Sequence, residues 1–93
     1  MAKTVFVHEF GDSVGVVLQD VVVGDELVLS ASTECSGDSF FACDDIPRFH
    51  KVALSEVAKD QDLIEYGETI GVATAMIHKG ELVHIHNLKT KRW

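Results

Sequence analysis

Two histidines near the C-terminal end are the residues of this chain whose types and spacing best suit chemistry. His84 and His86 stand two apart in the apolar run 83–88, and the amide of Asn87 follows them directly. If this run is a strand, residues i and i+2 point to the same face, about 7 Å apart. Both imidazoles could then reach one metal ion or one anionic ligand. The alternative is a pair of surface histidines on an edge strand.

A metal site needs more than this pair, because catalytic zinc sites commonly use three protein ligands and leave one position open. The third ligand could come from His8, His50 or another chain. His50 and Lys51 follow the only proline of the chain. A lysine beside a histidine at the start of an apolar strand suits an anionic substrate. The plainer alternative is the solvated end of a loop.

Tyr66 and Gly67 lie in a loop that is bounded by glycines. They could present a phenol and free backbone amides to a ligand, or they could form a turn whose aromatic ring covers the core. His78 is expected to be a solvated residue of a turn. The sequence contains no glycine-rich phosphate loop and no serine nucleophile in a strand-to-helix turn.

The elements that must position these residues follow a repeated pattern. Segments 18–28, 54–64 and 74–83 each show an apolar strand, a tight turn centred on Gly or Asp, and a second apolar strand. Gly and Asp tolerate the left-handed backbone that such turns require. The pattern predicts a small all-β domain with long, bent hairpins. Short helical turns are expected at 54–58 and 74–77, where the β pattern is weakest.

Composition limits the classes of partner. The chain has 93 residues and a net charge of −7, and 46% of its residues are hydrophobic. One domain over residues 1–93 is expected, ending in a basic tail at 88–93. The negative charge disfavours nucleic acid and anionic membranes as partners. The sequence has no apolar run long enough to span a membrane and no signal-peptide core, so we expect a cytoplasmic protein.

The two cysteines are expected to be unpaired. Cys35 and Cys43 fall in a predicted hairpin over 31–45, in which Cys35 would face Ser39 and Cys43 would face Ala31. Because they are not cross-strand neighbours, a disulfide is not expected. We interpret them as small buried side chains in a reducing compartment.

Three segments together resemble a known family. Residues 50–54 (HKVAL), 66–71 (YGETIG) and 80–87 (GELVHIHN) are similar to the SAF domain of the altronate/galactarate dehydratase family, and the start at 8–16 resembles the opening of that domain. The resemblance covers essentially the whole chain. It implies a β-clip fold that accompanies a much larger catalytic domain or subunit.

The resemblance also implies a function. Family members eliminate water from sugar acids, and a related two-subunit sulfo-lyase eliminates sulfite from a 2-hydroxy acid. This chain would be the small subunit of such a lyase, inactive alone, partnered by a large catalytic subunit and part of an oligomer. A divalent metal, Fe2+ or else Mn2+, would be held by the large subunit or shared with it. His84 and His86 would contact the metal, and the anionic substrate would be bound by His50, Lys51, Tyr66 and Asn87.

Two positions depart from the family pattern. Phe49 stands where the family usually has glycine, and Glu65 stands where altronate-type members usually have a basic residue. The missing cation favours a different or shorter substrate than altronate. The second hypothesis is a SAF module that binds carbohydrate or serves assembly without catalysis. Such a module would not need the histidines, the lysine and the amide together.

Overall fold

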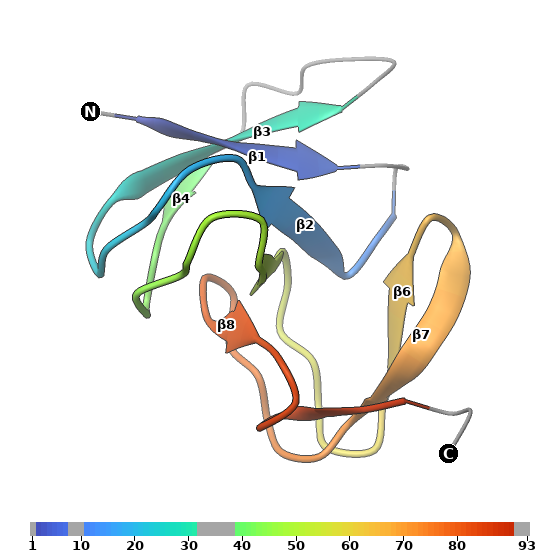
Figure 1. The fold of residues 1–93 in the computed structure, drawn as a ribbon. Coiled ribbons are helices and arrows are strands. Elements are labelled where there is room, and N and C mark those ends of the chain that lie inside the picture. The colour runs from blue at the N-terminus through green and yellow to red at the C-terminus, as the bar shows by residue number, and fades with distance from the viewer. Residues whose placement is uncertain (1, 8–10, 32–38, 91–93) are drawn as a thin grey trace.

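The computed structural model describes residues 2–7, 11–31 and 39–90, and these residues form strands and turns without a helix. The larger sheet has the strand order β4-β3-β1-β2-β5-β8 and the smaller one β6-β7-β9 (Figure 1). In chain order the strands are β1 Lys3–Val7, β2 Val14–Val17, β3 Glu26–Ala31, β4 Ser39–Phe41, β5 Lys51–Ala53, β6 Asp62–Glu65, β7 Glu68–Ala73, β8 Leu82–Val83 and β9 Leu88–Lys89. The predicted all-β fold is confirmed, and none of the described residues forms a helix suited to crossing a membrane.

The buried side chains form two apolar clusters, and most of them are β-branched residues that pack well on a pleated surface. The first cluster contains Val5, Val17, Val21, Leu27, Phe40, Ala42, Ile46 and Val52. The second contains Val14, Ala53, Val57, Leu63, Ala73, Ile77 and Val83. Strands β2 and β5 supply residues to both clusters, so these two paired strands join the two halves of the core.

Four corners of the same design connect the strands, one more than the sequence pattern predicts. In each corner a buried residue forms a β-bridge, and the third residue after it has a positive φ. The bridges join the corners in pairs, Val21 to Ile46 and Val57 to Ile77. The positive-φ residues are Gly24, Phe49, Asp60 and Gly80. The unpredicted corner is the one at 46–50, in which Phe49 takes the place of Gly or Asp.

Side chains cap three of these corners in one way. In each, the side chain of the fourth residue after the bridge residue accepts a hydrogen bond from the backbone N–H of the first residue after it. Asp25 accepts from Val22, Gln61 from Ala58, and Glu81 from His78. In the fourth corner the equivalent pair is Pro47 and His50. Proline has no N–H to cap, and the side chain of His50 bonds elsewhere in the turn, its Nδ1 lying 3.2 Å from the carbonyl oxygen of Arg48.

Several local expectations are wrong. Segments 54–58 and 74–77 are bends that lead into the bridge residues Val57 and Ile77, so neither forms a helical turn. The strands on either side of each corner pair with other strands and not with each other. The long hairpin that forms is β6–β7, with an irregularity in register at Leu63 and Ile64.

The hairpin expected to carry the cysteines has another register. Phe40 of β4 lies opposite Leu27 of β3, and Ala31 pairs with Val7 of β1, so Cys43 does not face Ala31. The thiol of Cys43 is free, and the residue is exposed, contrary to the expected burial. The position of Cys35 lies outside the described residues.

Candidate functional site

The structure brings His84 next to His50. Strands β5 and β8 are antiparallel, and Lys51 is the partner of Val83. Extending this register by one residue places His50 opposite His84, since cross-strand partners in an antiparallel pair have a constant sum of residue numbers. The two imidazole rings lie 5.1 Å apart between centroids, with 37° between their planes. Two histidines 34 positions apart in sequence therefore share one site.

The strand geometry predicted for His84 and His86 is wrong. Strand β8 ends at Val83, and residues 84–87 form a turn. The side chain of Asn87, 8% exposed, closes this turn. Its Oδ1 accepts a hydrogen bond from the N–H of His84 (3.0 Å), and its Nδ2 donates to the carbonyl of Leu82 (2.8 Å). Asn side chains favour such local bonds over a continued strand. The role of Asn87 in binding substrate stays a prediction.

His86 occupies the same turn and is exposed. Its carbonyl accepts a hydrogen bond from the hydroxyl of Thr74 (3.5 Å), which ties the turn to the strand end of β7. Among the described residues around this turn, the rings in contact are those of His50 and His84. The structure therefore pairs His50 with His84. The expected pairing of His84 with His86 depended on a strand that does not form.

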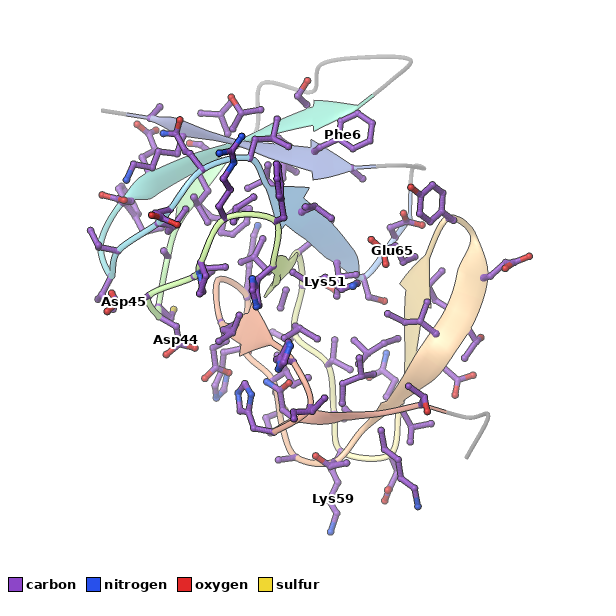
Figure 2. All side chains as sticks on the ribbon, in the orientation of Figure 1. Phe6, Asp44, Asp45, Lys51, Lys59 and Glu65 are labelled. Carbon is purple, nitrogen blue, oxygen red and sulfur yellow. The ribbon has the colours of Figure 1, made fainter. Side chains whose placement is uncertain are left out.

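Lys51 lies beside Glu65 (Figure 2). The ammonium Nζ is 3.8 Å from Oε1 of Glu65, and the Glu65 side chain is 8% exposed whereas that of Lys51 is 36% exposed. The carboxylate that departs from the family pattern thus points inward and pairs with the predicted substrate-binding lysine. An anionic ligand that approaches Lys51 meets an ammonium that already has a carboxylate partner.

Tyr66 and Gly67 form the tip of the β6–β7 hairpin, with φ of 59° and 71°. Their backbone amides donate to the two carboxylate oxygens of Asp12, at 3.0 and 3.1 Å. The amides are therefore not free for a ligand, and the ring of Tyr66, 60% exposed, does not cover the core. Asp12 is 7% exposed. Sequence reasoning missed this capping role, although an Asp between Gly11 and Ser13 is a typical turn residue.

The described residues do not hold a metal ion by themselves. Among them, no three His, Cys, Asp or Glu side chains are close enough to share one ion. His50 and His84 offer two imidazoles, which is fewer than the three protein ligands usual at a catalytic zinc site. His8, considered as a third ligand, lies outside the described residues. A metal bound here would need a ligand from beyond the described residues, either His8 or another chain.

His78 is not simply solvated, because it has a carboxylate partner. Its Nδ1 lies 2.9 Å from Oε1 of Glu56, and the other carboxylate oxygen of Glu56 accepts the N–H of Lys79. The hydrogen bond to Glu56, and after it the charge of that carboxylate, raises the pKa of His78 above its usual 6.5. The hydrogen bond from His78 lowers the pKa of Glu56 below 4.5. This pair links two corners of the second core cluster.

Comparison with known proteins gives a consistent result. The profile of the altronate/galactarate dehydratase SAF domain matches residues 2–91. The chain is 40% identical over 88 residues to the alpha subunit of (2R)-sulfolactate sulfo-lyase from Chromohalobacter salexigens, covering 94% of each protein. It is 37% identical over 79 residues to altronate dehydratase from Bacillus subtilis, and 38% identical over 79 residues to that from Escherichia coli. Those matches cover 85% of this chain and 15% of each dehydratase.

Proposed function

The chain belongs to the altronate/galactarate dehydratase SAF domain family, and on this basis we propose that it is the small subunit of a lyase that performs β-elimination on a 2-hydroxy acid. The observation that carries the proposal is the 40% identity to a sulfo-lyase alpha subunit over 94% of both proteins. A match over nearly the full length of both proteins supports the same role, that of a small subunit, in a similar enzyme complex. The altronate dehydratases are less similar as wholes, because the matching segment is 15% of their length.

The leaving group in this proposal is sulfite and the substrate is a short sulfonated 2-hydroxy acid. The pairing of Lys51 with Glu65 supports a substrate other than a long sugar acid. A carboxylate beside the lysine reduces the attraction of this position for another carboxylate. A substrate with two strong anionic groups compensates, since its second anion can lie on the exposed histidine side of the site.

The residues of this chain bind and orient the substrate. His50, Lys51 and His84 contact its anionic group, and the exposed phenol of Tyr66 donates a hydrogen bond at the hairpin tip. Asn87 holds the turn that carries His84 and His86. The large subunit would hold the divalent metal, Fe2+ or Mn2+, and His84 and His86 are the residues of this chain that would contribute to its site. When bound, the metal supplies Lewis-acid polarisation of a substrate oxygen. The base that removes the α-proton belongs to the large subunit.

Reconstitution tests this function. The chain, a purified large subunit and their mixture are assayed with (2R)-sulfolactate and with altronate, in the presence of Fe2+ or Mn2+. We expect turnover from the mixture only. His50→Ala and His84→Ala should each lower kcat/KM about tenfold to a hundredfold, as expected for losing a hydrogen bond to a charged group. His78→Ala, which changes a histidine of another corner, is the matched control and should leave kcat/KM unchanged.

Two results would contradict the proposal. Turnover by the isolated chain well above a metal blank would place the core chemistry here. Equal turnover by the large subunit with and without this chain would favour the alternative of a SAF module that binds carbohydrate or serves assembly.

A further inference from the structure

Phe49 has a backbone conformation that does not suit phenylalanine. Its φ is 68°, whereas the equivalent positions in the other three corners hold Gly24, Asp60 and Gly80. A positive φ brings Cβ of an L-residue against its own carbonyl. Asp and Asn tolerate this because their polar side chains bond locally, and glycine has no Cβ. Phe49 has neither advantage.

The strain at Phe49 is not offset by burial within the described chain. The residue is 61% exposed. Within the described residues its ring meets the guanidinium of Arg48, 4.5 Å from the ring centroid, and a contact of this kind is weak at an exposed site. Outliers held in a strained backbone without local compensation are found mainly at functional surfaces. The backbone strain at Phe49 would be offset if a partner protein covered its exposed ring.

A second exposed apolar residue adjoins the histidine pair in sequence. Ile85 is 83% exposed and follows His84 in the turn 84–87. Phe49 immediately precedes His50. Because the rings of His50 and His84 are in contact, the turns that carry Phe49 and Ile85 meet at the same point. We call Phe49 and Ile85, together with the adjacent His50 and His84, the Phe49–Ile85 surface.

We infer that the Phe49–Ile85 surface is the face on which the large catalytic subunit docks, with Phe49 as its buried anchor. This inference rests on the proposed function. The occupant is indicated by the relatives: the altronate dehydratases carry the matching segment within a chain of which it is 15%, so a large body of further protein accompanies it. Aromatic anchors at the centre of an interface carry much of its affinity. Docking here also encloses His50 and His84, for which the described residues supply no third metal ligand, at the contact between the subunits.

The variant Phe49→Gly tests the inference, because strain and docking predict opposite effects. Glycine relieves the positive φ, so the thermal midpoint of the free chain should not fall and should rise by up to about 5 °C. The affinity for the separately purified large subunit, measured by calorimetry, should fall about tenfold or more. Phe49→Tyr keeps the aromatic anchor and should bind within about threefold of the native chain. Phe41→Ser is the matched control, because Phe41 is 66% exposed on the edge strand β4, at the other end of the sheet order from β8.

Each outcome separates this inference from the proposed function. If the native chain does not bind the large subunit, the proposed function fails. If the native chain binds and Phe49→Gly binds equally well, the docking surface is elsewhere and only the inference is overturned. A parallel loss of midpoint and affinity would make Phe49 a structural residue and would also overturn it. A loss of self-association in Phe49→Gly without loss of large-subunit binding would overturn the inference too, because the occupant would then be a second copy of this chain.

Discussion

Glu65 lies where an anion-binding site would be expected to hold a cation, yet its carboxylate is nearly buried and lies 3.8 Å from the ammonium of Lys51. Removing a carboxylate from water is unfavourable unless an opposite charge or hydrogen bonds compensate. Lys51 supplies that charge from strand β5, which belongs to the other sheet. The pair therefore explains how an acid is accommodated beside Lys51, the lysine proposed to bind an anionic substrate.

Glu65→Lys should destabilise the free chain, because it replaces the partner of Lys51 with a like charge at a nearly buried position. We expect a loss of about 1–2 kcal/mol, discounted for the partial exposure of Lys51. This corresponds to a fall of about 5–15 °C in the thermal midpoint. Circular dichroism melting of the two proteins measures it.

Glu68→Lys is the matched control for this experiment. Glu68 is the cross-strand partner of Glu65, but it is exposed. The same change of charge there should alter stability by less than about 0.5 kcal/mol. Equal midpoints for both variants and the native chain would show that Glu65 behaves as a solvated surface charge.

At the scale of residues, the sequence identified the chemical types but not their contacts. His50, Lys51 and His84 were selected from spacing and neighbours, and the structure brings His50 and His84 together. Their partnership depends on the register between β5 and β8, which a local pattern does not encode. The strand prediction for His84 and His86 failed because the turn bonds of Asn87 prevailed over the apolar alternation. No local signal predicts that Asp12 caps a turn more than fifty residues away.

The corners are the elements that position the site, and three of them were predictable from sequence. Gly24, Asp60 and Gly80 mark their turns directly, because these residue types suit a positive φ. The fourth corner was missed since its turn residue is Phe49. A signal was nevertheless present: Ile46 precedes Phe49 by three residues, as Val21 precedes Gly24. How the corners pair through bridges could not be predicted, because it depends on packing between distant segments.

Pro47 should be required for stability because His50 does not cap its corner. In Pro47→Ala, a backbone N–H appears at residue 47 while the Nδ1 of His50 is engaged with the carbonyl oxygen of Arg48, and the fixed φ of proline is lost. We expect a cost of about 1 kcal/mol, or about 4–8 °C in the thermal midpoint. The double variant Pro47→Ala with His50→Gln recreates the arrangement of Ala58 and Gln61. It should recover about half of this loss.

The single variant His50→Gln completes the cycle as a control. With proline at residue 47 there is no N–H to accept, so this change alone should leave the midpoint nearly unchanged. If the double variant is no more stable than Pro47→Ala, residue 50 does not act as a cap in any background. The claim that Pro47 takes the place of a side-chain cap in this corner would then lose its support.

At the scale of the whole molecule, the site is supported by the strands that connect the two core clusters. Strand β5 contributes Val52 to the first cluster and Ala53 to the second, and it begins at Lys51. The polar residues of the site thus extend from the most firmly anchored part of the described chain. The exposed turns that carry Phe49 and His84 lie at its margin, where a partner can reach them.

Charge sets how the stability of the whole chain depends on pH. The net charge of −7 at pH 7 opposes compactness through self-repulsion. Two ion pairs add a pH dependence of their own. The hydrogen bond from Lys3 lowers the pKa of Asp25 below 3.8, and the Glu56–His78 pair lowers the pKa of Glu56 and raises that of His78. Both pairs link segments distant in sequence.

The free energy of unfolding should therefore be greatest between about pH 4.5 and 6.5, the ordinary pKa values of Glu56 and His78. The contribution of His78 is complete below 6.5 and is lost as pH rises through its raised pKa, whereas that of Glu56 is complete above 4.5 and is lost as pH falls through its lowered pKa. Melting curves of the native chain and of His78→Gln across pH 4 to 9 test this. The difference between their midpoints should be largest inside the window and should shrink on both sides. A difference that stays constant across the whole range would mean that the pair does not set the pH dependence of this fold.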